Sequence, residues 1–262
     1  ACFGLSGCDI PADGPQLLRH AIRPLGLGGP AVVFNDAFIP LFHDRYRDRG
    51  VTVTSGSWHK WLGINGRKTF AHDGLHVTGL RERTAAELTQ LAEGYRTPSP
   101  FTRSLLRPLG FRPAREYTER WVFGRDKRAF VRPVTPRSER AFHALPEWLA
   151  RFARRGDRDA LRVLDAYAAD LVEGTRALIR ALRLGRGACD VILSGSGLTG
   201  TPALARAFRR RLRSVAPRAR IMVARARPIR GALLYAAHHA SWRFPPGKLR
   251  DPRLFYLKPV NQ

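Results

Sequence analysis

The chain has few of the residues that would place it in a secreted, disulfide-held or membrane-spanning class. Its 262 residues include only three cysteines, Cys2, Cys8 and Cys189, too few and too scattered for a disulfide framework. No run approaches the roughly 18 apolar residues of a membrane span, so we expect no membrane partner. The first residues, 1–5, have neither a basic leader nor a long apolar region, so we expect no secretory signal and a cytoplasmic location.

Methionine and lysine are scarce as well. The only methionine is Met222, so we expect either a processed chain or a piece of a longer one. Lysine and arginine number 46 against 21 acidic residues, giving a formal charge of +25, yet only five of the 46 are lysine. Clustered cations bind nucleic-acid phosphates by releasing counterions. Here the arginines are spread from Arg19 to Arg253 without a nucleic-acid motif, as a GC-rich coding sequence would also produce. A solvated arginine-rich surface is therefore the favoured interpretation, and nucleic-acid binding the least favoured function.

The chain is 44% hydrophobic, enough for a sizeable core, and apolar strands alternate with helices in its first part. That alternation favours an α/β fold with parallel strands. An Asn65-Gly66 turn predicts a hairpin, because it supplies the positive φ angles of a tight turn. We expect Thr84 to cap a helix over 85–95. The expected strands are 2–7, 31–34, 51–54, 61–64, 68–71, 190–194 and 220–224, and the other expected helices are 15–25, 36–46, 138–154, 157–184, 201–213 and 229–240.

The stretch 190–237 is the most informative part of the chain. A buried strand runs into Ser194-Gly195-Ser196-Gly197, and a helix, a second strand and a small-residue helix follow. Gly195 and Gly197 carry no side chain, so the backbone there can approach a nucleotide closely. An ordinary strand–turn–helix joint is the alternative.

This stretch resembles the adenosine-binding end of the actin-like ATPase and sugar-kinase superfamily. Within it, the chain looks most like the BadF/BadG/BcrA/BcrD-type ATPases and N-acetylglucosamine kinases. Further segments match in order along the chain: Gly4-Leu5-Ser6-Gly7-Cys8-Asp9-Ile10-Pro11, Val33-Phe34-Asn35-Asp36-Ala37, Val51 through Asn65, and Gly156-Asp157 before a long helix. The resemblance implies actin-like ATPase (ribonuclease H-like) lobes, with ATP and Mg²⁺ as cofactors and a sugar as substrate.

The resemblance also implies roles for individual residues. Asp36 would be the catalytic base that takes a proton from a sugar hydroxyl, and Asn35 would bind that sugar. The alternative for Asp36 is that it caps the helix that follows. The phosphate-binding loop would be Ser55-Gly56-Ser57, with an ordinary hairpin turn as its alternative. The adenosine contacts would be Ser194, Gly195, Ser196 and Gly197. No residue is assigned to a metal.

Three departures from the family pattern point to an impaired or incomplete kinase. Trp58-His59 replaces Gly-Ser, an acidic pair is missing near Gly79, and the usual first Asp-Gly-Gly-Gly-Thr-like hairpin is absent. We therefore expect a truncated first lobe at 1–50, a second lobe at 51–240 with an irregular insertion near 97–136, and an extended tail at 241–262. The missing part would come from a longer precursor or from another chain, and the partner is expected to be a second copy in a homodimer or a chain that supplies the missing first lobe. The alternative function is a non-catalytic relative that binds nucleotide or recognises a partner.

Overall fold

The computed structural model of the protein describes residues 1–5, 8, 12–26, 31–56, 59–66, 68–72, 79–92, 97, 99–106, 136–186, 188–224 and 228–239. The predicted tail at 241–262 and most of the predicted insertion lie outside these residues. In the described parts of the chain, no helix is both long and apolar enough to cross a membrane.

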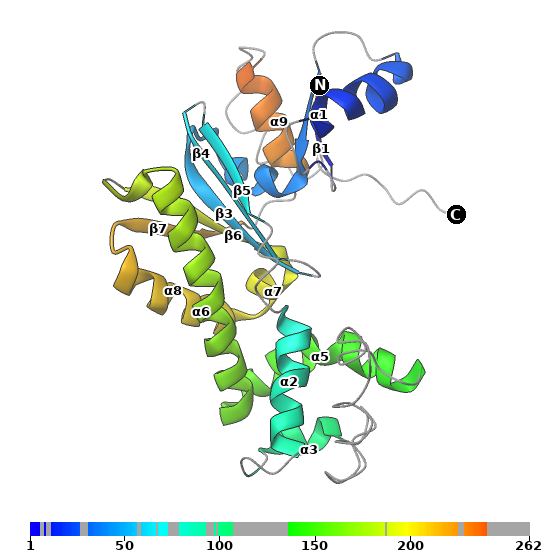
Figure 1. Cartoon of the computed structure of the whole chain (residues 1–262), viewed down its shortest axis with the longest axis vertical. Helices are drawn as coiled ribbons and strands as arrows, with labels where there is room; N and C mark the ends of the chain where they lie inside the picture. Colours follow the sequence, from blue (N-terminus) through cyan, green and yellow to red (C-terminus); the bar gives the residue numbers. More distant parts are fainter. Residues whose placement is uncertain are drawn as a thin grey trace.

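A mixed five-stranded sheet, in the order β5–β4–β3–β6–β7, forms the centre of the fold (Figure 1). Its strands β3, β4 and β5 pair antiparallel, and β6 and β7 run parallel to β3. Gly66, with φ of 59°, closes the predicted Asn65-Gly66 hairpin. Because Thr54 pairs with Ser194, β3 and β6 end at the same edge of the sheet. The bounds are β3 Arg49–Ser55, β4 His59–Asn65, β5 Lys68–His72, β6 Cys189–Ser194 and β7 Ala219–Val223.

Helices α6 and α8 cover one face of this sheet and enclose the main core. Val51 and Val53 of β3 point into it, together with Trp61 of β4. The indole Nε1 of Trp61 donates a hydrogen bond to the carbonyl of Leu171 at 3.1 Å. Asp157 caps α6 by accepting hydrogen bonds from two of its first backbone N–H groups. The bounds are α6 Arg158–Ala181 and α8 Pro202–Val215, with the short η5 Leu184–Arg186 between α6 and β6.

The opposite face is covered by η3 and α9, which pack on each other. Leu41 and Phe42 of η3 form a second core with Ile64 and Ile192 of the sheet, and Leu234 of α9 packs against it. The expected helix at 36–46 is thus a shorter 3-10 helix. A separate parallel pair, β1 and β2, lies beside α9 with the first helices of the chain (Figure 1). The bounds are β1 Cys2–Leu5, α1 Asp13–Leu17, η1 Leu18–Ile22, η2 Arg23–Leu25, β2 Val32–Asn35, η3 Asp36–Phe42 and α9 Pro228–His239.

Three helices, α2, α3 and α5, form a group at the lower end of the molecule (Figure 1). The sequence suggested that Thr84 caps α2. Thr84 instead lies inside the helix, so that prediction is wrong. Its hydroxyl donates instead to the carbonyl of Leu80 at 2.6 Å. The bounds are α2 Leu80–Ala92, α3 Pro100–Leu106, α5 Pro136–Arg154 and, after β6, the short α7 Gly195–Gly200.

The predicted division of the chain near residue 50 remains a prediction. Strand β3 begins at Arg49, and β1 and β2 form a sheet of their own before it. However, α9 contacts β1 and η3, so residues 228–239 lie against the first part of the chain.

Gly174 provides a test of the main core, because its missing side chain makes room for Trp61. A Cβ at Gly174 would lie 2.5 Å from Cε2 of the Trp61 ring. We expect Gly174→Ala to lower the free energy of unfolding by about 2 kcal/mol, since overpacking outweighs the gain of about 1 kcal/mol in helix propensity. Urea unfolding measures this. Gly200→Ala is the control, because no atom lies within 4 Å of its Cβ position, and equal losses in both variants would contradict the packing.

Candidate functional site

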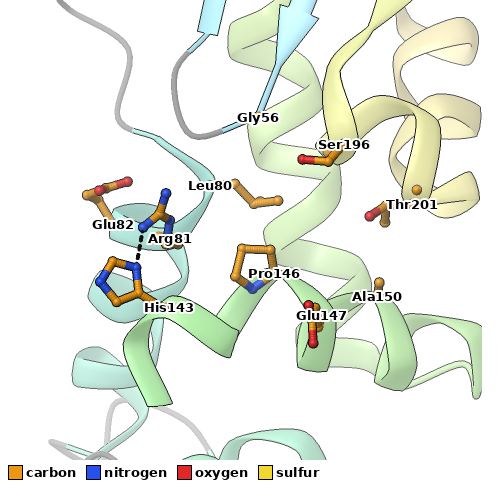
Figure 2. Close-up of a pocket in the computed structure, with 12 residues that line it drawn as sticks. Gly56, Leu80, Arg81, Glu82, His143, Pro146, Glu147, Ala150, Ser196 and Thr201 are labelled. Atoms are coloured by element: carbon orange, nitrogen blue, oxygen red, sulfur yellow. Dashed lines mark hydrogen bonds between the residues drawn. The ribbon is translucent and has the colours of Figure 1, made fainter. Parts of the chain in front are cut away.

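Two cavities open where β3 and β6 end. The first, of about 430 Å³, lies between η3, the ends of β3 and β6, and the start of α9, and we call it the Asp36 cavity. The second, of about 400 Å³, lies between α2, α5 and α7, and we call it the His143 cavity (Figure 2). Ser196 lines both. A ligand that passes Ser196 could therefore reach from one cavity into the other.

Asp36 presents its carboxylate to the Asp36 cavity and does not cap η3. The cap is Asn35, whose Oδ1 accepts a hydrogen bond from the backbone N–H of Ala37 at 2.9 Å. The sequence-based alternative that Asp36 is the cap is therefore wrong. Asp36 is exposed, and no hydrogen bond or ion pair joins its carboxylate to another described residue. Asn35 is only 4% exposed and its oxygen serves the cap, so its contact with a sugar remains a prediction.

Thr54 and Ser194 provide the hydroxyls at the sheet edge of the Asp36 cavity. Their Oγ atoms lie 2.7 Å apart across the β3–β6 pair. Ser55 points to the other face, where its hydroxyl lies 2.9 Å from the Tyr167 hydroxyl and the residue is 1% exposed. Because side chains alternate along a strand, Val51, Val53 and Ser55 share the core face and Thr54 faces the cavity. The same alternation in the sequence could have identified Thr54, which the sequence analysis missed.

Of the other two predicted phosphate-loop residues, the structure describes Gly56 but not Ser57. Gly56 lines the His143 cavity, and a Cβ there would lie 3.7 Å from Oγ of Ser196. Ser57 lies outside the described residues. The backbone of Ser55 and Gly56 therefore remains the predicted phosphate contact, whereas the hydroxyl of Ser55 faces the core.

The end of β3 leaves no room for a side chain at Gly195 or Gly197. Gly195 has φ of 80°, and a Cβ there would lie 2.3 Å from the carbonyl oxygen of Ser55. A Cβ at Gly197 would lie 2.6 Å from Oγ of Ser55. The two glycines thus let α7 close against β3. This contact fixes the turn whether or not a nucleotide approaches it, and Ser196, which is exposed between them, is the side chain left facing the cavities.

The His143 cavity carries polar groups that no motif predicted. Arg81 and His143 approach each other at 2.7 Å between Nη1 and Nδ1, and Glu82 and Glu147 also line the cavity (Figure 2). These four residues come from α2 and α5, which are distant in sequence from Gly195 and Gly197. Among the described residues, no group of three or more His, Cys, Asp or Glu could hold a metal ion.

Comparisons with known proteins show the fold of the chain. No protein-family model matches it, and no curated protein matches it. The solved structure of a proposed N-acetylglucosamine kinase from Chromobacterium violaceum is 19% identical, with a TM-score of 0.52 over 89% of this chain and 74% of that one. A second proposed N-acetylglucosamine kinase, from Porphyromonas gingivalis, is 17% identical, with a TM-score of 0.50 over 91% and 77%. A glucokinase from Streptomyces griseus, solved with glucose and AMPPNP, is 15% identical with a TM-score of 0.46 over 82% and 69%. The predicted fold class is confirmed: the mixed sheet and its helices match the actin-like ATPase fold of sugar kinases.

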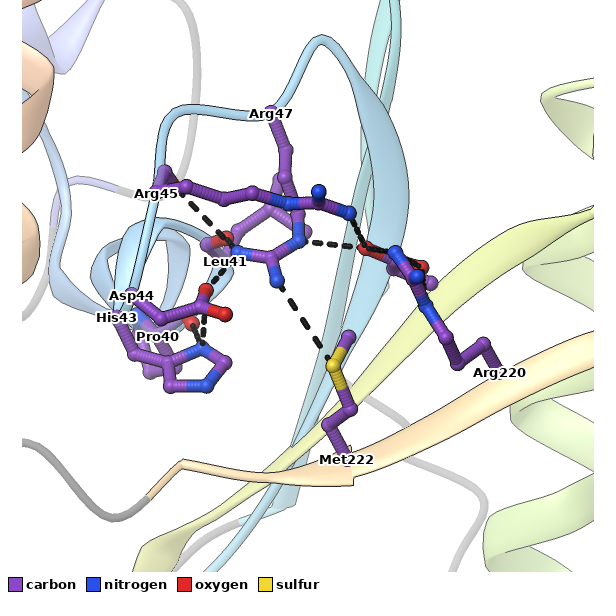
Figure 3. A network of polar contacts seen from close by, with 9 residues as sticks. Pro40, Leu41, His43, Asp44, Arg45, Arg47, Arg220 and Met222 are labelled. Atoms are coloured by element: carbon purple, nitrogen blue, oxygen red, sulfur yellow. Dashed lines mark hydrogen bonds and ion pairs between the residues drawn. The ribbon is translucent and has the colours of Figure 1, made fainter.

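Asp190 is the centre of a charge network near the start of β6, beside the end of η3 (Figure 3). It stands near the start of β6 and accepts hydrogen bonds from Arg47 at 2.6 Å and from Arg220 at 2.8 and 2.9 Å. Arg47, whose side chain is 3% exposed, also donates to the carbonyl of Leu41 at 2.9 Å. Burial by itself would raise the pKa of the Asp190 carboxyl, but the hydrogen bonds and charges of Arg220 and Arg47 outweigh it and lower that pKa to about 2. The network joins the end of η3 to β6 and β7, which is a structural role.

Removing this charge should destabilise the fold in a pH-dependent way. We expect Asp190→Asn to cost about 2 kcal/mol at pH 7, because the buried Arg47 loses a charged hydrogen-bond acceptor and keeps only Asp44 as a carboxylate partner. Since the folded-state pKa of Asp190 lies below the ordinary value of about 3.9, its stabilisation is present above about pH 4 and is lost as the pH falls towards 2. Chemical unfolding between pH 2 and 7 measures both effects.

Asp165→Asn is the matched control. Asp165 pairs with Arg210 and Arg211, but its side chain is 35% exposed, so its loss should cost less than about 1 kcal/mol. Equal losses in the two variants, or an unchanged acid dependence in Asp190→Asn, would show that the network is not a structural joint.

Proposed function

We propose that the chain binds ATP and transfers its terminal phosphate to a hydroxyl group of a sugar. The observation that carries this proposal is that Asp36 and residues Ser194–Ser196 line one cavity, although they lie far apart in the sequence. The shared fold with two proposed N-acetylglucosamine kinases supports the same reaction. Our assignment to the BadF/BadG-type branch of that superfamily is part of the proposal and rests on the sequence resemblance.

The two cavities suggest a path for the nucleotide. The base and ribose would occupy the His143 cavity, and the phosphates would pass Gly56 and Ser196 towards Asp36. Both cavities are of the size that small ligands use, roughly 300–1,000 Å³. A carboxylate such as Glu82 or Glu147 can accept hydrogen bonds from an amino or hydroxyl group there, whereas it would repel a phosphate. We therefore place the phosphates at the other end, beyond Ser196.

Asp36 is suited to act as the base. Its exposed carboxylate can take the proton from a sugar hydroxyl while that oxygen forms a bond to the γ-phosphorus and the bond to ADP breaks. Phosphoryl transfer depends mainly on positioning and on stabilising charge. The Asn35 cap and the packing of η3 on the sheet hold Asp36 in place.

The donor set of the Asp36 cavity fits Mg²⁺ that arrives with the nucleotide. Mg²⁺ keeps several waters and is usually held by one or two carboxylates together with substrate phosphates. The described lining offers one carboxylate, Asp36, and the hydroxyls of Thr54 and Ser194. These groups would hold the ion through its waters, and the ion would neutralise charge on the phosphates.

A non-catalytic nucleotide-binding relative is the second candidate. The observation in its favour is the Ser55 hydroxyl, which contacts Tyr167 and so cannot serve a phosphate. The two candidates differ in one respect that can be measured, because both bind ATP but only the kinase transfers phosphate.

Filling the junction of the cavities should block nucleotide binding. Ser196 is exposed and lines both, so the ring of Ser196→Trp would occupy the path without disturbing the core. We expect the Kd for Mg·ATP to rise at least about 10-fold, equivalent to about 1.4 kcal/mol, in isothermal titration calorimetry. Ser214→Trp, on the exposed end of α8, is the control and should bind as the unaltered protein does. Equal affinity in the unaltered protein and Ser196→Trp would rule out this path.

Replacing the proposed base should affect transfer more than binding. We expect Asp36→Asn to lower kcat for phosphorylation of a hexose or amino sugar by about 10²–10⁴-fold. The Kd for ATP measured without Mg²⁺ should change less than about 2-fold, because the Asp36 carboxylate would meet the nucleotide only through the ion. Coupled detection of ADP measures the rate. Asp48→Asn is the matched control, since Asp48 is also exposed but precedes β3 at the far end of the sheet. ATP binding without any transfer by the unaltered protein would favour the non-catalytic relative.

A further inference from the structure

The last two residues of β3 are held by hydroxyl groups on both faces of the sheet. On the cavity face, Oγ1 of Thr54 lies 2.7 Å from Oγ of Ser194. On the core face, Oγ of Ser55 lies 2.9 Å from the hydroxyl oxygen of Tyr167, which belongs to α6. Gly56 follows directly, and its backbone is the predicted phosphate contact. The pair of Ser55 and Tyr167 is therefore one residue away from that contact.

The hydroxyls of Ser55 and Tyr167 are buried in an apolar core. Both residues are 1% exposed, and Tyr167 is part of the main core. Val51 and Val53 precede Ser55 on the same face of β3. Because a buried hydroxyl is costly unless it is hydrogen-bonded, a phenylalanine opposite an alanine would fill this space without that requirement. Apolar packing alone therefore does not explain why a tyrosine meets a serine at the end of β3.

The backbone of Ser55 is confined by α7 as well. A Cβ at Gly195 would lie 2.3 Å from the carbonyl oxygen of Ser55 and 2.9 Å from its backbone nitrogen. The carbonyl of Ser55 and the N–H of Gly56 belong to one planar peptide group. The contacts that fix the Ser55 carbonyl therefore also fix the direction of the Gly56 N–H. A Cβ at Gly56 would lie 3.7 Å from Oγ of Ser196, so this N–H stands at the junction of the two cavities.

Tyr167 is well suited to hold Ser55, because α6 is itself anchored on both sides of this residue. Asp157 caps the start of the helix, and one turn after Tyr167 the carbonyl of Leu171 accepts a hydrogen bond from the indole of Trp61. Burial raises the pKa of Tyr167 to about 12, although its hydrogen bond with Ser55 acts in the opposite direction. The hydroxyl therefore stays protonated at neutral pH and adds no negative charge that would repel a nucleotide.

We propose that Tyr167 is a positioning residue of the nucleotide site, whose hydroxyl holds Ser55 so that the backbone N–H of Gly56 points at the phosphates. This inference rests on the proposed function, because it requires a nucleotide whose phosphates pass Gly56. Tyr167 touches no substrate and acts only through Ser55. Such positioning matters because a misplacement of about 1 Å at a site can lower a rate by about 10²-fold.

The first experiment separates the phosphates from the rest of the nucleotide. In calorimetry on the full chain, Tyr167→Phe and Ser55→Ala should each raise the Kd for Mg·ATP at least about 5-fold, since a hydrogen bond to a charged group is misaligned. The Kd for adenosine, measured by its competition with Mg·ATP, should change less than about 2-fold because adenosine carries no phosphate. Tyr46→Phe removes a phenol hydroxyl beside the second core and should leave both affinities unchanged.

The double variant Ser55→Ala/Tyr167→Phe separates positioning from stability. Removal of both hydroxyls leaves neither one buried without a partner, so the urea midpoint lost in each single variant should be largely regained. A pair that only stabilises the core would regain the affinity for ATP as well. A positioning pair would not, and the double variant should still bind Mg·ATP at least about 5-fold more weakly than the unaltered protein. This variant also tests the proposal if Tyr167→Phe alone fails to fold.

Thr175→Val is the matched control for the loss of a buried hydrogen bond in α6. The Thr175 hydroxyl is fully buried, donates to the carbonyl of Leu171 at 2.7 Å and accepts from the Trp61 indole at 3.2 Å. It has no contact with Ser55 or Gly56 in the described part of the chain. Thr175→Val should therefore lower the urea midpoint and leave the ratio of the ATP and adenosine affinities unchanged.

The possible failures can be told apart. If the unaltered protein binds Mg·ATP and Tyr167→Phe, Ser55→Ala and the double variant bind it equally well, the inference is wrong while the proposed function stands. Full recovery of ATP affinity in the double variant, or an equal loss of affinity for adenosine and ATP, also overturns the inference. If the unaltered protein binds neither Mg·ATP nor adenosine, the proposed function is wrong and the inference falls with it.

Discussion

The contact of Gly195 and Gly197 with the end of β3 is the constraint on which the candidate site depends. Gly195 adopts a positive φ and lies so close to the carbonyl of Ser55 that a Cβ atom at this position would clash with the carbonyl oxygen. Together with the parallel pairing of β3 and β6, this contact brings Thr54 and Ser194 to one edge. A residue with a Cβ at position 195 would push α7 away from the sheet, and both cavities would lose a wall.

The other wall comes from η3, which is held independently. Asn35 ends β2 and caps η3, so Asp36 is turned out towards the cavity while Leu41 and Phe42 pack on the sheet. The network around Asp190 then ties the end of η3 to the start of β6 and β7. The cavity is thus bounded by two elements that are each fixed to the same sheet, which is the arrangement that positioning of a base and a phosphate requires.

The sequence predicted the elements whose signals are local. Glycine predicts the Asn65-Gly66 hairpin and the turn at Gly195, because both positions have a positive φ that other residues rarely adopt. The apolar run before Ser194 predicts the strand there. Asp36 is a candidate base because the segment around it resembles a family pattern. The orientation of Ser55 was missed although the alternation Val51–Ser55 contains it. His143 and Arg81 could not be predicted, because only the packing of α2 against α5 brings them together.

We propose that one nucleotide spans both cavities past Ser196. The most direct measurement is a crystal structure of the chain with Mg²⁺ and a non-hydrolysable ATP analogue. We expect the adenine base in the His143 cavity, the phosphates beside Gly56 and Ser196, and the γ-phosphate within reach of the Asp36 carboxylate. A nucleotide bound elsewhere, or both cavities free of nucleotide at a saturating concentration of the analogue, would contradict it.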